Sequence, residues 1–352
     1  MNQIEFQGRS FAGASVANYG VVETGDIVYT KSPLKSNPYG IIKANKGKNG
    51  IVSTLYAVYK PKQSVNPEFV QIYFEQDARM NNYMHPLVNK GAKNDMKVSA
   101  ENALKGQIVF PDIKEQRTIS EFFRNLETLI TLHQRKYEKL VNIKKSMLNK
   151  MFPPNGASVP EIRFKGFTDP WEQRKLKELY FQLTERNTDL LPYQKTLSVA
   201  TMSFKTDGNG AADTSLANYK RLRTGDIAFE GHTSKEFRYG RFVLNDVGDG
   251  IMSPRFSALR PLHEMPINFW KYYIHYEPIM RKVLVNSTKA GTMMNELVIN
   301  DFLQGSILVP SMAEQQAIGR FFKQLDTLIT LHQRKLEKLQ NIKKSCLEKM
   351  FV

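Results

Sequence analysis

One long stretch occurs twice in this chain, and the duplication constrains the fold more than any other feature of the sequence. The first copy runs from Glu115 to Phe152 and the second from Glu314 to Phe351. Residues 128–136 and 327–335 share the sequence TLITLHQRK without a change. A long internal repeat indicates two copies of one structural unit, so the architecture is a duplication.

Each copy is predicted to form a long helix. Apolar residues recur at steps of three and four, which is the spacing of a coiled-coil seam, and neither copy contains proline. A helix with one apolar stripe needs a partner to be stable, and the other copy is the available one. The predicted seam comprises Phe122, Leu126, Leu129, His133, Leu140, Ile143, Phe321, Leu325, Leu328, His332, Leu339 and Ile342.

His133 and His332 are interpreted as polar seam residues that fix the register of the helix pair. A metal-binding or acid-base role has less support, because no second ligand follows at i+3 or i+4.

The repeat extends beyond the helices into the preceding globular parts. Residues 24–27 recur as 224–227, and Pro111 matches Pro310. Short apolar runs between turn residues predict strands, and residues 267–285 favour helix, so the fold class is α+β with a strand-rich core. The predicted domains are residues 1–113 and 153–313, each followed by a long helix at 114–152 and 314–352. The first domain has no counterpart of the stretch between Phe152 and Phe204, so we expect it to be incomplete at its N-terminal side.

Charge and composition favour a nucleic-acid ligand. The formal net charge is +16 and the pI is about 9.6, a balance typical of nucleic-acid binding; an anionic membrane surface is the other physical option. No run of apolar residues is long enough for a membrane span. The single cysteine, Cys346, excludes disulfides within the chain and suits the cytoplasm.

Basic and polar residues on predicted loops are the candidate DNA contacts. Lysine and arginine bind phosphates or guanine, and histidine and serine can bond to base edges. The candidates are Lys31, Lys35, Lys93, Lys205, Arg221, Arg223, His232, Ser234, Lys235, Arg238, Arg241, Arg255 and Lys289. No catalytic or metal-binding constellation is predicted: Asn66–Phe69 differs by one residue from an amino-methyltransferase motif, and the glycine pairs are isolated turns.

Three motifs together carry a resemblance to a known family. Pro-x-x-x-Glu-Gln opens both long helices, at Pro111 and at Pro310. The repeated helix has a Leu-x-x-Leu-Ile core, and residues 160–171 (PEIRFKGFTDPW) open the second globular part. In these motifs the chain resembles the specificity subunit of Type I restriction-modification enzymes, over essentially its whole length.

The resemblance implies a DNA-recognition subunit without a catalytic centre. Each globular part would be a target recognition domain that reads one half of a bipartite site in double-stranded DNA. The helices would pair antiparallel and dock two modification subunits, which methylate adenine, and restriction subunits would join. The resemblance implies no cofactor on this chain, and S-adenosylmethionine, ATP and Mg²⁺ on the partners.

Alternatives remain open at this point. The shortened first domain also fits a truncated or silent specificity allele, a chain that works through its intact second domain alone, or a chain that works after pairing with a second specificity chain. The same basic charge is also compatible with a coiled-coil assembly protein that has a basic surface. A third alternative, an enzyme with a hidden active site, has the least support.

Overall fold

The computed structural model describes residues 16–31, 37–88, 97–153, 157–205, 207 and 213–351. The chain divides into two compact units. Unit 1 comprises residues 1–136 and 332–352, and unit 2 comprises residues 137–331. Each unit therefore combines a globular part with segments of both long helices, whereas the predicted domains kept the helices separate.

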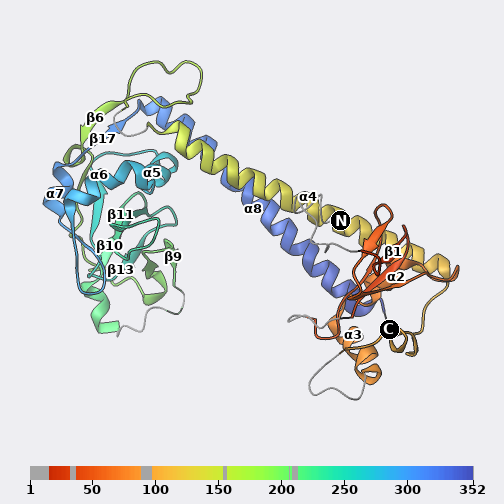
Figure 1. Cartoon of the computed structure of the whole chain (residues 1–352). Coiled ribbons are helices and arrows are strands. Elements are labelled where there is room, and N and C mark those ends of the chain that lie inside the picture. Colours follow the sequence, from red (N-terminus) through yellow and green to blue (C-terminus); the bar gives the residue numbers. More distant parts are fainter. Residues whose placement is uncertain are drawn as a thin grey trace. The chain divides into compact units, whose positions relative to one another are not determined.

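Both copies of the repeated stretch are long helices, α4 (Ile113–Met151) and α8 (Met312–Lys349) (Figure 1). In unit 1 the Lys343 Nζ lies 3.1 Å from the Glu127 Oε1, and the His133 and His332 Nδ1 atoms lie 2.8 Å apart. Glu127, nearer the start of α4, thus contacts Lys343 near the end of α8, and His133, which follows Glu127, contacts His332, which precedes Lys343. The two helices therefore pair antiparallel. The α+β fold with two globular parts and a coiled-coil helix pair is confirmed.

The predicted seam is wrong at four positions. The side chains of Phe122, Leu129, Leu328 and Ile342 are exposed. After Phe122, Leu129 and Leu328 the apolar face runs through the following residue instead, so Phe123 is buried, and Ile130 and Ile329 are half-buried; the residue after Ile342 is Lys343, which pairs with Glu127. Adjacent apolar pairs such as Phe-Phe and Leu-Ile satisfy either register, and packing selects one: Phe123 belongs to a core cluster with Phe69.

The other seam positions lie toward the partner helix or the globular core. Leu126 and Leu325 are buried. The half-buried positions are His133, Leu140, Ile143, Phe321, His332 and Leu339.

Unit 2 is built on a four-stranded antiparallel sheet with strand order β12-β11-β14-β7. These strands are β7 (Tyr180–Gln182), β11 (Ile227–Glu230), β12 (Arg241–Leu244) and β14 (Ala258–Pro261). Four smaller antiparallel pairs join β6 (Glu172–Lys175) to β17 (Ser306–Val309), β8 (Leu197–Ser198) to β9 (Ser203–Phe204), β10 (Lys220–Leu222) to β13 (Gly250–Met252), and β15 (Thr288–Lys289) to β16 (Glu296–Leu297).

An aromatic core holds the helices of unit 2 to this sheet. The helices are α5 (Ile267–Tyr273), α6 (Glu277–Ser287) and α7 (Ile299–Gln304), with 3-10 turns at residues 176–178, 193–195 and 213–218. Phe152 of the segment after α4 packs against Tyr273 of α5 and Phe322 of α8, with ring centroids 5.2 and 5.9 Å apart. Both long helices therefore contribute side chains to the core of unit 2.

Unit 1 repeats much of this arrangement at an offset of 200 residues. Its strands are β1 (Gly20–Val22), β2 (Ile27–Thr30), β3 (Ile42–Ala44), β4 (Gly50–Val52) and β5 (Tyr56–Tyr59). They form a β3-β2-β5 sheet and a β1-β4 pair, which match β12-β11-β14 and β10-β13. The helices α2 (Pro67–Tyr73) and α3 (Asp77–Met84) match α5 and α6, and 3-10 turns follow at residues 85–87 and 102–104.

The repeated Thr-Gly-Asp-Ile motif is a turn with the same geometry in both units. Gly25 and Gly225 have φ angles of +94° and +93°, which favour glycine. The Asp226 Oδ2 accepts a hydrogen bond of 2.7 Å from the Arg223 backbone N–H, and Asp26 does the same for Glu23 at 2.8 Å. The motif thus sets the entry into β2 and β11.

No helix among the described residues is long and apolar enough to cross a membrane.

Candidate nucleic-acid interface

Three connections of unit 2 meet to form one surface. They are the β11–β12 loop at residues 231–240, Arg255 between β13 and β14, and the β15–β16 hairpin at residues 288–297; we call this the loop face. The Asn295 backbone N–H donates to the Gly231 carbonyl at 2.9 Å. A Cβ at Gly231 would lie 2.0 Å from the Asn295 carbonyl oxygen, so the hairpin and the loop pack closely only because residue 231 is glycine.

The loop face collects most of the predicted DNA contacts of unit 2. Its side chains reach solvent, as a ligand on the surface requires. The exposed candidates on it are His232, Ser234, Lys235, Arg238, Arg255 and Lys289.

Local contacts orient several of these groups. The His232 Nδ1 lies 2.5 Å from a carboxylate oxygen of Glu230, which is buried at the end of β11. The Ser234 Oγ accepts a hydrogen bond of 3.0 Å from the Phe237 N–H, which shapes the loop. The Lys289 Nζ lies 3.7 Å from Glu296 across the hairpin. A cationic surface of this kind can bind a phosphate backbone and place side chains at base edges.

Two further candidates lie outside the loop face. Arg241 stacks its guanidinium over the Phe237 ring at 4.9 Å and donates to the Ala200 carbonyl at 3.1 Å. These contacts link β12 to the β8–β9 turn. Lys205 directly follows β9 and is exposed.

Arg221 and Arg223 are held in ion pairs rather than presented as free cations. Arg221 is only 13% exposed and lies 3.0 Å from Asp189, and Arg223 lies 2.7 Å from Glu185. Arg260 joins the same cluster by bonding to Glu185 and to the buried Asp226. The hydrogen bond from Arg223 lowers the pKa of Glu185, and the bonds to Asp226 raise the pKa of Arg260. The sequence predicts the arginines as candidates, but it does not predict the carboxylates that neutralise them, because these lie far away along the chain.

Of the three predicted DNA contacts in unit 1, Lys31 lies within the described residues. Lys31 is half-buried at the end of β2, where its backbone N–H donates to the Leu55 carbonyl at 3.0 Å. Lys35 and Lys93 lie outside the described residues.

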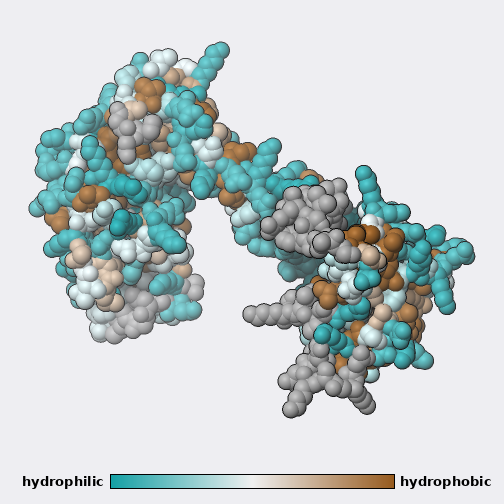
Figure 2. Space-filling view, viewed as in Figure 1, coloured by the Kyte–Doolittle hydropathy of each residue, from teal (hydrophilic) through white to brown (hydrophobic). Residues whose placement is uncertain are grey.

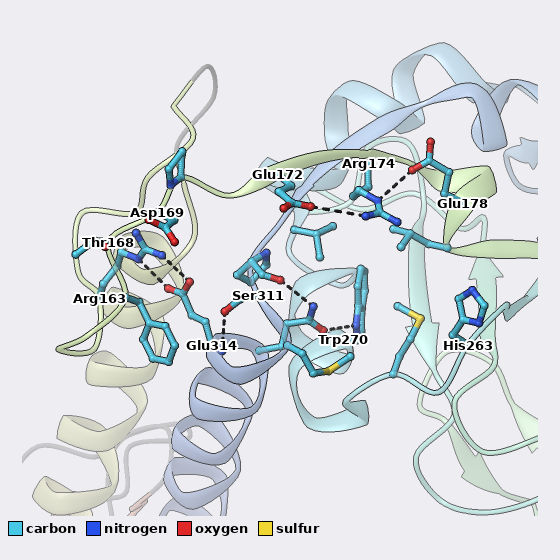
Figure 3. Close-up of a pocket in the computed structure, with 18 of the residues that line it drawn as sticks. Arg163, Thr168, Asp169, Glu172, Arg174, Glu178, His263, Trp270, Ser311 and Glu314 are labelled. Carbon is cyan, nitrogen blue, oxygen red and sulfur yellow. Dashed lines mark hydrogen bonds and ion pairs between the residues drawn. The ribbon is translucent and has the colours of Figure 1, made fainter.

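The Pro-x-x-x-Glu-Gln motifs anchor the starts of the long helices. In unit 2 the Gln315 side chain donates to the Pro310 carbonyl at 3.0 Å and accepts from the Trp270 Nε1 at 2.9 Å (Figure 3). In unit 1 Gln116 repeats this by donating to the Pro111 carbonyl at 2.8 Å and accepting from the Asn66 N–H at 2.8 Å. The sequence shows the motif itself. Its role in anchoring the starts of the long helices depends on contacts that form only in the fold.

Glu314 of the same motif forms a buried ion pair with Arg163. The Arg163 Nε and Nη2 lie 2.9 and 2.6 Å from its two carboxylate oxygens, and this pairing raises the pKa of Arg163. The pair connects the PEIRFKGFTDPW segment to the start of α8 and borders a cavity of about 410 Å³ (Figure 3). Asp169, Glu172 and Glu178 also line this cavity, so its charge disfavours a phosphate backbone.

No cluster of metal-ligating side chains occurs in the part of the chain that the structure describes.

Comparison with known proteins identifies the family that matches the part of the chain carrying the loop face. Residues 169–341, which include the whole loop face, match the family described as the Type I restriction modification DNA specificity domain. This part of the chain belongs to the DNA specificity domains of Type I restriction-modification systems. Members of this family recognise DNA, assemble with other subunits and are not catalytic themselves. The family predicted from the three motifs is therefore confirmed.

Relatives of this specificity subunit are distant in sequence. A curated protein of Methanocaldococcus jannaschii, named as the MjaX type I restriction specificity subunit, is 20% identical over 349 residues, covering 94% of this chain and 78% of the relative. The HsdS subunit from Thermoanaerobacter tengcongensis has 16% identity and a TM-score of 0.46, covering 96% of this chain and 83% of that one. The S subunit from M. genitalium has 13% identity and a TM-score of 0.49, covering 94% and 84%.

Proposed function

We propose that this specificity subunit recognises a bipartite site in double-stranded DNA, with the loop face of unit 2 reading one half. The observation that carries this proposal is the convergence of Lys235, Arg238, Arg255 and Lys289 on one surface with His232 and Ser234. Such a surface combines phosphate-binding cations with groups that bond to base edges, which is the combination that sequence recognition requires. Unit 1, with the same strand and helix order, would read the other half.

The helix pair formed by α4 and α8 would dock two modification subunits, which methylate adenine, and would set the spacing of the two half-sites. Restriction subunits would join this complex. S-adenosylmethionine, ATP and Mg²⁺ would act on those partners, and this chain would hold no cofactor. We expect this chain to act in the cytoplasm, because the proposed ligand is DNA.

Methylation mapping tests this proposal. The chain is co-expressed with a Type I modification subunit in a methylation-free host, and N6-methyladenine is mapped across the genome. We expect a split motif with two defined halves. Arg238→Ala should relax or abolish one half and leave the other unchanged, because a lost base contact affects only its own position.

The matched control is Lys177→Ala, which removes an exposed cation of unit 2 outside the loop face and the helix pair. This control should leave the motif unchanged. An unsplit motif, or loss of both halves together in Arg238→Ala, contradicts the assignment of one half-site to the loop face. Absence of methylation with every modification subunit tried contradicts the proposed function.

A further inference from the structure

The internal repeat allows each position of unit 1 to be compared with its equivalent in unit 2. Ile51 and Ile251 occupy the same place in β4 and β13, yet Ile51 is 53% exposed and Ile251 is fully buried. Val21, which pairs with Ile51 across the β1–β4 ladder, is 65% exposed. Hydrophobic surface is visible on unit 1 where it carries β1 (Figure 2). A face that is buried in one copy of the repeat is therefore open in the other.

Two segments of unit 2 cover Ile251: one carries Leu216 and Tyr219, which match Val16 and Tyr19 of unit 1, and the other crosses Gly250. Thr196 forms a parallel bridge with Ile251, and Leu191 packs on the same cluster. A Cβ built at Gly250 would meet the Lys195 carbonyl oxygen at 2.6 Å and the Leu197 side chain at 2.8 Å. A Cβ built at Gly50 meets nothing within 4 Å among the described residues. Unit 1 thus has a glycine where unit 2 needs one to admit a crossing segment.

The sheet edges repeat this contrast. In unit 2, β14 has β11 on one side and β7 on the other, and β17 pairs with β6. In unit 1 the equivalent β5 pairs only with β2 among the described strands. Residues 107–110, which match β17, form no described strand, and Val109 is 91% exposed. Unpaired strand edges of this kind are templates for pairing with another segment.

We propose that this open face of unit 1 binds a strand-bearing segment from a second specificity-type polypeptide, equivalent in chemistry to residues 169–205 of this chain. The open face consists of Val21, Gly50 and Ile51, the outer edge of β5, and residues 107–110. Binding occurs by strand addition at the two edges and by an aliphatic contact across Gly50, as in unit 2.

The occupant is identified by what covers the same elements in unit 2. Residues 172–175 pair with β17, residues 180–182 with β14, and residues 195–197 cross Gly250 and Ile251. One continuous segment therefore meets all three parts of the equivalent face. The charges of the two units differ at this face: Glu185 of this segment bonds to Arg260 and Arg223, whereas in unit 1 Lys60 and Glu23 occupy those two positions and pair with each other at 2.8 Å.

Peptide binding to the whole chain tests the proposal. A fluorescent peptide with the sequence of residues 169–205 is titrated with the purified chain, and anisotropy gives the Kd. We expect saturable binding that Ile51→Lys and Gly50→Val weaken by about tenfold or more, because one buries an unpaired ammonium and the other fills the crossing space. Hydrogen exchange should show slower exchange at residues 50–52 and 107–110 when the peptide is bound.

The controls are Gly47→Val and Val285→Lys, which alter an exposed glycine of unit 1 and an exposed apolar residue of unit 2. Both should bind the peptide as the unchanged chain does. Absence of binding overturns the proposal, and so does binding that Ile51→Lys leaves intact, because the peptide then replaces the native segment of unit 2. Self-association of the chain that Ile51→Lys abolishes also overturns it, since residues 169–205 of a second copy are already paired within its own unit 2 and another surface of that copy then covers the face. None of these readouts depends on DNA recognition, so they stand apart from the proposed function.

Discussion

Arg163 and Glu314 show how a single buried ion pair fastens a helix to a recognition unit. Their side chains are 11% and 2% exposed, so Glu314 depends on Arg163 for its compensating charge. We predict that Arg163→Met lowers the free energy of unfolding by about 3–5 kcal/mol, because it leaves a buried carboxylate unpaired. Denaturant unfolding followed by circular dichroism measures this loss.

Two variants separate the ion pair from general packing. Arg174→Met removes an exposed guanidinium that pairs with Glu178, and should cost about 0.5 kcal/mol or less. Adding Glu314→Leu to Arg163→Met should restore much of the lost stability, since the uncompensated charge is gone. If the double variant is as unstable as the single one, the loss comes from packing.

His332, whose Nδ1 lies 2.8 Å from the Nδ1 of His133, gives the helix pair a predicted pH dependence. Burial first, and then the neighbouring His133, Lys136 and Lys335, lower the pKa of His332 below 6.5. The unfolded chain therefore binds more protons than the folded chain as the pH falls below 6.5, so stability is full above that pH and declines as the pH drops toward the folded pKa. Melting temperatures measured from about pH 5 to pH 8 should show this decline.

The double variant His133→Leu/His332→Leu should flatten this pH dependence. His263→Leu changes an exposed histidine of unit 2 and serves as the control. An equal slope in all three proteins would mean that other groups set the acid sensitivity.

At the scale of elements, the β15–β16 hairpin depends on its close approach to the β11–β12 loop. We predict that Gly231→Ala displaces the hairpin, because the added Cβ meets the Asn295 carbonyl at 2.0 Å. Recognition of one half-site should weaken while the melting temperature changes by only a few degrees, since the hairpin is a surface element. Methylation mapping and thermal unfolding of the same variant report the two effects.

Gly47→Ala is the matched control, because the nearest atom to its added Cβ is the Asn45 side chain at 3.6 Å. It should alter neither readout. A Gly231→Ala protein that keeps its full motif would show that the hairpin position is unimportant for recognition.

At the scale of the whole molecule, the net charge of +16 predicts DNA binding that weakens steeply with salt. Replacing Lys235, Arg255 and Lys289 with alanine should reduce the slope of log K against log salt by about 3, since each phosphate contact contributes about 0.9. Titrations of the complex with modification subunits at several salt concentrations measure the slope.

A triple alanine variant of Lys165, Lys177 and Lys282 loses the same charge from exposed positions of unit 2 outside the loop face. Its slope should change less than that of the loop-face variant. Equal changes would mean that net charge, rather than the loop face, governs affinity.

The sequence by itself determined the duplication, the two long helices, the α+β class and the family. Each of these is written in local periodicity or in short motifs, and the turns at Gly25 and Gly225 need no distant partner to be recognised. The basic composition likewise indicated the ligand class, because charge is additive along the chain.

Only the tertiary structure decided which residues of these patterns pack into the core and which charged residues are neutralised by ion pairs. Phe123 rather than Phe122 faces inward because Phe69 packs against it, and Arg221 is neutralised by Asp189, far away along the chain. The contrast between Ile51 and Ile251 has the same origin, since equivalent strands differ in what covers them. Packing and ion pairing depend on partners that meet only in the folded chain, so local sequence patterns do not reveal them.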